Sequence, residues 1–271
     1  MKHQQRLLFI IYYLLFGVVP YALVGCSHID EGERLIYVEP AYSKPEAVSR
    51  AVLLEDFTGQ RCVNCPRGTE VIEQLQQELG DSLFIAVGIH SGPLGFKGTA
   101  KALGLATDDG DEYYNYWKLE YQPVGLINRH GAVNYTDWTA EVVKELARTA
   151  TLKLTAEAAV SGSQADITVN ALGTDGTTTG KLQVWLLEDG ITALQMMPDG
   201  STDTGYVHNH VLRTPVNGTW GQDFTVSESE ERTFTFSQPI NETWNRLKLS
   251  IVAFVYNDSG VLQATKAKVK N

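Results

Sequence analysis

The stretch AVLLEDFTGQRCVNCPRG, residues 51–68, decides the fold of the first half of this chain. Residues 51–57 are apolar and predict a buried strand. After a short turn, Cys62 opens a helix that ends at Gly80. The predicted apolar face of this helix consists of Val71, Ile72, Leu75 and Leu79. Residues 83–90 predict a second buried strand, so the order is strand, helix, strand, and we expect the two strands to be parallel.

The chain up to residue 150 continues with mixed helical and strand patterns. Residues 91–110 are rich in glycine and give no clear element, whereas residues 111–119 predict a short aromatic helix. A strand at 124–128 follows, Gly131 marks a hairpin turn, and residues 137–149 predict a helix. Its inward side chains should be Trp138, Val142, Val143 and Leu146. We therefore predict one α/β domain over residues 51–150.

Beyond residue 150 the pattern changes to an alternation of period two. Apolar residues alternate with others from Leu152 to Val160 and again from Ala165 to Ala171. The segments 173–176 and 257–260 are typical of hairpin turns. About eight strands and no convincing helix are expected, which predicts an all-β, immunoglobulin-like sandwich over residues 151–271.

The Cys62–Cys65 pair carries the chemistry predicted for the first domain. It has the Cys-x-x-Cys spacing at a strand-to-helix turn. Unpaired N–H groups and the helix dipole favour a thiolate at a helix N-terminus, and a thiolate is the attacking species in disulfide exchange. We expect Cys62, on the open side of the turn, to be the nucleophile and Cys65 to be the buried thiol that resolves the mixed disulfide.

This region resembles the thioredoxin superfamily at three places: the Cys62/Cys65 pair, Asp56 six residues before it, and Pro123 before a strand. The resemblance implies that Asp56 is a buried acid that takes a proton from the second cysteine. It also implies that Pro123 is a cis-proline facing the disulfide, beside a groove for an extended peptide. Pro66 and the glycine-rich segment 91–110 depart from the family pattern and leave substrate and redox potential open.

Each of these features has an alternative interpretation. The cysteines could bind zinc, but no second pair exists and His90 could add only one ligand. They could also form an inert structural disulfide in an oxidising compartment. Asp56 could be an ordinary strand residue, with Glu55 on the opposite face, and Pro123 could be trans.

Residues 1–25 predict a lipoprotein signal peptide. Lys2 and Arg6 precede an apolar run, and Leu-Val-Gly-Cys at 23–26 resembles the bacterial lipobox, in which the cysteine is acylated and the chain is cut before it. An uncleaved transmembrane anchor is the alternative, because the apolar run could nearly span a bilayer. Residues 26–50 are polar and predict a tether.

Taken whole, the chain resembles the outer membrane protein 28 family of bacterial lipoproteins. The residues that carry this resemblance are the lipobox with Cys26, the string 55–66 and the string Tyr206–Arg213. The family implies a lipid-anchored outer-membrane location, periplasmic or surface-facing, with a thioredoxin-like domain and a β-rich domain. His208 and His210 should share one face of a strand, which could begin a metal site, but packing is the favoured interpretation and no metal or cofactor is predicted.

The net charge of −10 disfavours binding to nucleic acid, because an acidic surface repels phosphates. Two functions remain. The first is thiol–disulfide exchange with the thiols or disulfides of exported proteins. The second is a surface binding or adhesion lipoprotein that uses the thioredoxin-like fold as a scaffold. The substrate, the direction of electron flow and the role of the second domain stay open.

We predict that lipid on Cys26 is the only membrane attachment, because the chain has a lipobox and, after it, no apolar run near the roughly 20 residues that a membrane-spanning helix needs. Cys26→Ala should abolish the mass increase due to acylation, measured on the intact protein, and should remove the chain from the lipid-anchored fraction. A variant that stays in the membrane with an uncut N-terminus would instead indicate a transmembrane anchor.

Overall fold

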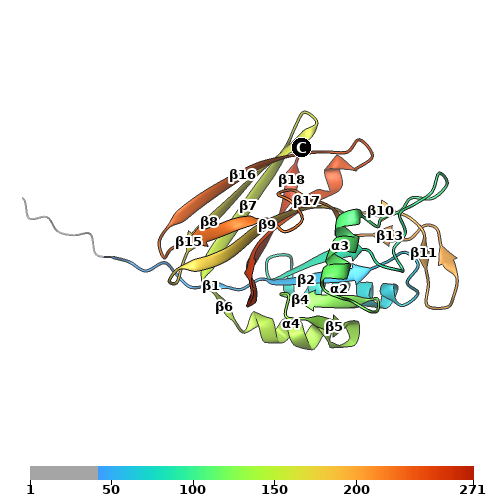
Figure 1. Ribbon diagram of the computed structural model, residues 1–271, viewed down its shortest axis with the longest axis horizontal. Helices are drawn as coiled ribbons and strands as arrows, with labels where there is room; N and C mark the ends of the chain where they lie inside the picture. Colours follow the sequence, from blue (N-terminus) through green and yellow to red (C-terminus); the bar gives the residue numbers. More distant parts are fainter. Residues whose placement is uncertain (1–41) are drawn as a thin grey trace, which may run out of the picture. The chain divides into compact units, whose positions relative to one another are not determined.

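The computed structural model describes residues 42–271, and residues 44–271 form one compact unit (Figure 1). The predicted signal peptide, Cys26 and residues 26–41 of the predicted tether lie outside the described residues. All the helices and strands of the described residues belong to the unit that begins at Lys44.

The predicted strand, helix and strand at the start of the unit are confirmed. They are β2 (Val52–Thr58), α2 (Cys65–Leu79) and β3 (Phe84–His90), and the two strands pair in parallel along their whole length. The helix, however, begins at Cys65 rather than at Cys62, which lies in the preceding turn. The reason is local: Pro66 fits the first turn of a helix, where a backbone N–H has no partner in any case.

The remaining elements of this part are short. They are β4 (Val124–Ile127), β5 (Ala132–Asn134), α3 (Asp108–Tyr116), the 3-10 helix η2 (Tyr135–Asp137) and α4 (Trp138–Leu146). The aromatic helix therefore begins three residues earlier than predicted, since Thr107 Oγ1 caps it by accepting from the Gly110 amide at 3.0 Å. Val143 was expected to point inward but is 59% exposed, because the buried stripe of α4 runs through Trp138 and Val142.

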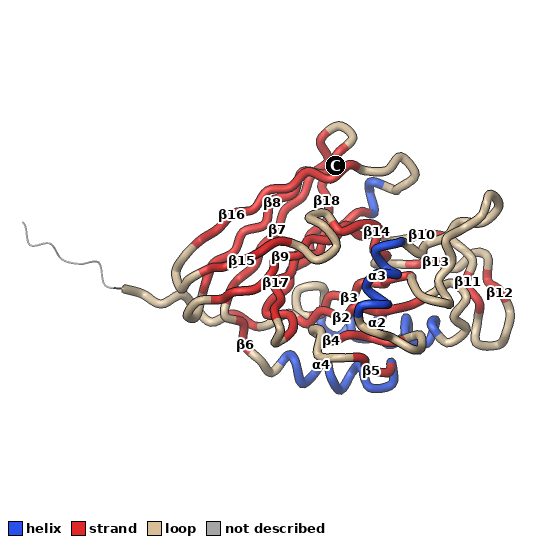
Figure 2. The backbone as a smooth tube through the Cα atoms, in the orientation of Figure 1, coloured by secondary structure: helices blue, strands red, loops and turns tan. Residues whose placement is uncertain are grey.

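The other strands are short connecting pairs or long members of one sheet. Their bounds are β1 (Val48–Ser49), β6 (Thr149–Ala150), β7 (Leu152–Ser161), β8 (Gln164–Gly173), β9 (Thr178–Glu188), β10 (Ile191–Thr192), β11 (Gln195–Met196), β12 (Thr202–Asp203), β13 (Val207–His208), β14 (Val211–Pro215), β15 (Gln222–Val226), β16 (Glu231–Pro239), β17 (Leu249–Asn257) and β18 (Gly260–Lys270). The 3-10 helix η3 (Arg246–Lys248) precedes β17. Figure 2 shows that strands dominate this part of the chain, as the alternation predicted.

The long strands form two layers that enclose a common core. Strands β16, β8 and β7 are antiparallel neighbours, and β9, β17 and β18 form a second antiparallel run. Side chains from both runs pack in one cluster, among them Ile167 of β8, Leu182 of β9 and Ile251 of β17. The end of β18 closes the arrangement by pairing in parallel with β7. The prediction of a β-rich second half is confirmed.

Of the two predicted hairpin turns in this half, one is confirmed and one is wrong. Residues 257–260 join β17 to β18, which pair with each other. Residues 173–176 join β8 to β9, which are not neighbours in the sheet, so this turn carries the chain from one layer to the other. Gly173 is required there because a Cβ would lie 2.0 Å from the Ser227 carbonyl oxygen.

A single strand, β14, joins the sheet of the first half to that of the second. It pairs antiparallel with β9 and in parallel with β3, where Val211 lies opposite Gly88. One core cluster correspondingly combines Leu53 and Phe57 with Trp185 and Phe254. Sheet and core thus continue across residue 150. Whether fragments 51–150 and 151–271 fold independently stays a prediction.

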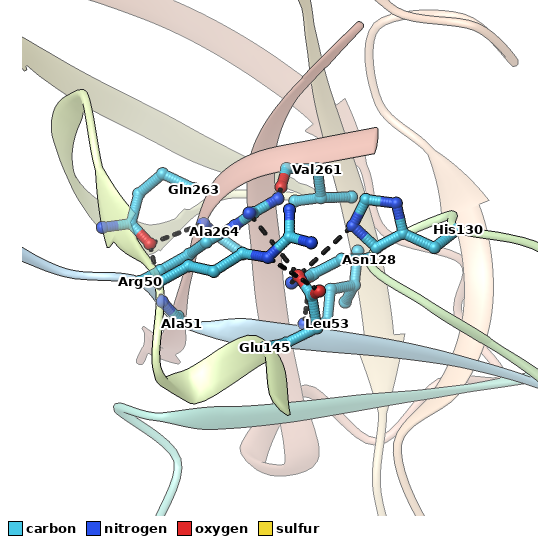
Figure 3. Close-up of polar contacts among 10 residues, drawn as sticks. Arg50, Ala51, Leu53, Asn128, His130, Glu145, Val261, Gln263 and Ala264 are labelled. Carbon is cyan, nitrogen blue, oxygen red and sulfur yellow. Dashed lines mark hydrogen bonds and ion pairs between the residues drawn. The ribbon is translucent and has the colours of Figure 1, made fainter. Parts of the chain in front are cut away.

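A polar network around Glu145 also links distant segments (Figure 3). Its carboxylate lies 3.5 Å from Arg50 Nη1, accepts from Asn128 Nδ2 at 2.9 Å and lies 3.2 Å from His130 Nε2. Arg50 also donates to the Val261 carbonyl of β18. The start of β2, helix α4 and the β17–β18 hairpin are therefore held together by hydrogen bonds as well as by apolar packing.

A second buried charge pair lies on the face of β2 opposite Asp56. Arg129 Nε donates to Glu55 Oε1 at 2.6 Å, and both side chains are almost completely buried. The Arg129 guanidinium lies 4.2 Å from the ring centre of Tyr256 and 4.9 Å from that of Phe254. The aromatic rings of β17 thus help to compensate for the lost hydration of the cation.

We predict that Glu55→Gln lowers the free energy of unfolding by about 3–5 kcal/mol, because it leaves the Arg129 charge buried without its counter-ion. Urea denaturation of the soluble unit measures this change. The double variant Glu55→Met/Arg129→Met should recover part of the loss, and the exposed Glu157→Gln should change the midpoint little. A Glu55→Gln variant as stable as the parent would show that the pair does not hold β2 against β17.

Candidate functional site

The candidate site is the turn between β2 and α2, where Cys62 and Cys65 are joined in a disulfide. The turn is closed by backbone hydrogen bonds: the Cys62 amide donates to the Gly59 carbonyl at 3.0 Å, and the Cys65 amide to the Cys62 carbonyl at 3.3 Å. Cys62 is only 1% exposed and Cys65 only 2%. The expectation that Cys62 lies on an open side of the turn is therefore wrong in this conformation.

Residues 191–210 lie over this turn, together with the loop around Leu94, whose carbonyl accepts from the Arg61 amide at 3.0 Å. We call residues 191–210 the covering segment; they carry β10, β11, β12 and β13. Gln195 Nε2 donates to the Cys62 carbonyl at 2.9 Å and to the Gly59 carbonyl at 3.3 Å. The Met196 amide donates to the Gln60 carbonyl at 2.9 Å. Sequence reasoning missed Gln195, because no motif marks a glutamine that acts from more than 130 positions away.

Asp56 and Cys65 border the same small cavity, whereas Glu55 points to the opposite face of β2 and contacts Arg129. Asp56 is 3% exposed and lines a small cavity of about 20 Å³ together with Cys65 and Tyr206. Its Oδ1 has no hydrogen-bond partner among residues 42–271. Burial raises the pKa of the Asp56 carboxyl to about 8, so that this group gains or loses a proton near neutral pH.

Three histidines border the same cavity: His90 at the end of β3, His208 at the end of β13, and His210. The rings of His90 and His208 lie 5.1 Å apart and meet edge to face. Burial lowers the pKa of His208 and of His210 to about 4 and lowers that of His90 well below its ordinary value, so the three rings are neutral at pH 7.

The predicted common strand face of His208 and His210 is wrong, because β13 ends at His208 and His210 adopts a left-handed backbone with φ of 45°. Both side chains nevertheless border one cavity. The sequence offers His90 only as one further zinc ligand beside the two cysteines, although its position at the carboxyl end of β3, next to β2, could have placed it near them. Within the described residues, no group of three or more His, Cys, Asp or Glu is arranged to hold a metal ion.

Pro123 follows a cis peptide bond from Gln122. The Gln122 side chain fastens this segment to the ends of both parallel strands, since its Nε2 donates to the Thr58 carbonyl at 2.7 Å and to the Ser91 carbonyl at 2.9 Å. Pro123 also packs near Gly68 of α2. That Pro123 borders a substrate groove stays a prediction.

These features define a β-rich protein in which one sheet carries a Cys-x-x-Cys disulfide buried beside an unpaired carboxyl group. The model of the family described as outer membrane protein Omp28 matches residues 110–271, and the chain belongs to this family of outer membrane proteins. No helix within residues 42–271 is both long and apolar enough to span a membrane.

Two solved structures, HBP35 and AGR_C_4864, are similar in fold to this chain. HBP35 of Porphyromonas gingivalis has a TM-score of 0.64 at 13% identity, over 83% of this chain and 77% of that one. Protein AGR_C_4864 of Agrobacterium tumefaciens has a TM-score of 0.51 at 16% identity, over 83% of this chain and 96% of that one. A domain of the outer membrane lipoprotein Omp28 from P. gingivalis is 25% identical over 45% of this chain and 89% of that one, with a TM-score of 0.33. No curated protein matches the sequence.

We predict that Asp56 makes the oxidised protein less stable as pH rises from about 6.5 to 8. The folded state keeps the Asp56 proton up to a pKa of about 8, whereas the unfolded chain loses it near 4, so stability falls with pH between these values. The buried histidines have lowered pKa values and act in the opposite direction, with an effect that fades as the pH rises above about 6.5, the pKa of a histidine in the unfolded chain. The difference in slope between the parent and an Asp56 variant therefore isolates the contribution of Asp56, because both proteins contain the same histidines.

Thermal unfolding of the oxidised protein across this range tests the prediction. Asp56→Asn should remove a slope of up to about 1.4 kcal/mol per pH unit, whereas the exposed Asp166→Asn should leave the slope unchanged. Equal slopes for the parent and Asp56→Asn would mean that the carboxyl is already ionised at pH 6.5.

Proposed function

We propose that this protein is a lipid-anchored outer-membrane lipoprotein whose thioredoxin-like part, residues 51–150, exchanges disulfides with exported proteins through Cys62 and Cys65. The observation that carries the proposal is the carboxyl group of Asp56. It is buried beside Cys65, lacks a hydrogen-bond partner among the described residues, and has a pKa of about 8. An inert structural disulfide has no need for such a group, which lowers stability wherever it is buried unpaired.

The proposed exchange moves one proton between Asp56 and Cys65. In the oxidising direction, a thiolate of the partner attacks Cys62 Sγ and the Cys62–Cys65 bond breaks. Cys65 leaves as a thiolate and takes the proton of neutral Asp56. A second thiolate of the partner then attacks the partner's own sulfur, releases Cys62, and leaves the partner with a disulfide. The reducing direction runs these steps backwards, with Asp56 taking the Cys65 proton. A carboxyl with a pKa near 8 suits both directions, because a thiol ionises near 8.5.

Exchange with another protein requires the covering segment to move, since Cys62 is only 1% exposed. The polar contacts that hold this segment over the turn include the two Gln195 bonds and the bond from Met196 to Gln60. Neutral hydrogen bonds of this kind contribute about 1 kcal/mol each, and the segment also buries Ile191 and Ala193 against Leu105 and Val211, so opening has to offset both contributions. We propose that partner binding displaces the covering segment and exposes Cys62.

The proposed anchor rests on the Leu-Val-Gly-Cys string ending at Cys26 and on membership of a family of outer membrane proteins. Lipid on Cys26 holds the unit at the membrane, where exported chains pass. An oxidising environment there keeps the Cys62–Cys65 disulfide formed between reaction cycles.

We predict that Cys65→Ser traps mixed disulfides with exported proteins, because Cys62 then forms the intermolecular bond and nothing resolves it. Cys62→Ser should trap none. Cells are treated with acid and a thiol-blocking reagent, and adducts are separated on non-reducing gels and identified by mass spectrometry.

A variant of the covering segment makes the test sharper. Cys65→Ser/Gln195→Ala should trap more partner than Cys65→Ser alone, because it removes both Gln195 bonds to the turn. The matched control Cys65→Ser/Gln238→Ala changes an exposed glutamine on β16 and should leave trapping unchanged. If no adduct forms with either double variant or with Cys65→Ser, the cysteines are a structural disulfide and the enzyme interpretation fails.

A further inference from the structure

A second and larger cavity lies away from the disulfide, on the other side of β2. Its volume is about 660 Å³, and its walls include Tyr116 at the end of α3, Trp117, Arg129, Trp220, Asp223 and Tyr256 of β17. This volume lies within the range of about 300–1,000 Å³ that is typical of sites for small molecules. The proposed disulfide exchange uses none of these residues.

Aromatic rings form the apolar walls of this cavity. The rings of Tyr116 and Trp220 lie 4.3 Å apart, and those of Tyr116 and Trp117 lie 5.3 Å apart. Polar anchors hold two of the walls in place: Trp220 Nε1 donates to Glu112 at 2.7 Å, and the Tyr256 hydroxyl donates to the Trp220 carbonyl at 2.8 Å. Tyr116 is nonetheless 62% exposed, so that its ring is accessible to a ligand in the cavity.

Hydrogen-bond donors and carboxylate acceptors both surround these rings. Two buried donors at the wall, Arg129 Nη1 and Trp117 Nε1, have no acceptor among residues 42–271. At the rim, Asp223 is 97% exposed and Asp258 adds a second carboxylate. A buried donor without a partner is rare in folded proteins, and these two give the wall a polar layer behind its rings.

The charges of the cavity decide between a neutral and an anionic ligand. Arg129 is neutralised by Glu55 at 2.6 Å, and Lys181 is paired with Asp223 at 3.2 Å. Within the lining, the cations Arg129 and Lys181 are thus balanced by the carboxylates Asp223 and Asp258, and Glu55 lies behind the wall. Because neither cation lacks a counter-charge, an anion gains little there, and the ligand should offer hydroxyl groups, which can donate to the carboxylates and accept from Lys181.

We infer that this cavity binds a neutral saccharide. A pyranose ring presents a flat face of C–H groups to the rings of Tyr116 and Trp220, and its hydroxyls match donors and acceptors together. This inference stands independently of the disulfide chemistry, because β2 separates the two sites: Glu55 supports the saccharide cavity and Asp56 the disulfide, on opposite faces of the strand.

The test uses the oxidised soluble unit with four probes: maltose, cellobiose, lactose and N,N′-diacetylchitobiose. Trp117 and Trp220 line the cavity, so at least one probe should give a saturable change in tryptophan fluorescence with a dissociation constant of about 1 mM or tighter. Saturation-transfer NMR should show contact between the C–H groups of the sugar and the protein's aromatic protons. Tyr116→Ala should weaken binding about three- to tenfold, the loss expected for one aromatic contact.

Tyr121→Ala is the matched control, because Tyr121 is also an exposed tyrosine at 45% but does not line the cavity. It should bind as the parent does, and circular dichroism should show that both variants keep the fold. Lack of saturation with all four sugars, or equal weakening by Tyr116→Ala and Tyr121→Ala, would overturn the inference. Saturable binding of glucuronate or benzoate with none of the neutral sugars would overturn it as well, by showing an anion site.

Discussion

The pairing of β14 with β3 is the contact on which the rest of the structure depends. At this junction the Gly88 amide donates to the His210 carbonyl at 2.9 Å, and Val211 lies opposite Gly88. Because β14 also pairs with β9, the parallel strands of the first half become part of the same sheet as the long strands of the second. The covering segment ends directly before β14, and this pairing therefore places His208 and His210 against the cavity beside Cys65.

Strand alternation on β2 gives two adjacent acids opposite electrostatic environments. Glu55 faces Arg129 and the aromatic rings of β17, and the Arg129 charge opposes the rise in its pKa that burial causes. Asp56 faces the disulfide and the neutral histidines, where no cation compensates for its burial, so its pKa rises to about 8. The difference comes from which side of a strand each residue occupies. On one face of the sheet, Asp56 is thereby suited to proton transfer. On the other face, the pair of Glu55 and Arg129 forms a rigid wall of the aromatic cavity.

The covering segment connects the second half of the chain to the proposed chemistry of the first. A Cys-x-x-Cys turn at the end of a sheet is usually open to partners, whereas this one is closed by Gln195 and Tyr206. A closed turn protects the disulfide from nonspecific thiols and makes exchange depend on whatever displaces the cover. If the covering segment must move, the β-rich half helps to determine which partner can react, because it supplies that segment.

The sequence by itself determined the local features of this protein. Apolar runs and a Cys-x-x-Cys turn predicted β2, α2 and β3, alternation predicted the long strands, and the period of two placed Glu55 and Asp56 on opposite faces. Only the tertiary structure decided that Cys62 is covered, that His90 meets His208, and that rings from α3, β17 and Trp220 meet in a cavity. The physical reason is that the side chains of a helix or strand face its buried side at regular intervals. The spacing of apolar residues in the sequence therefore indicates which side is buried. Which segment packs against that side depends on contacts between residues more than a hundred positions apart. Such contacts produce no regular spacing of residue types in the sequence.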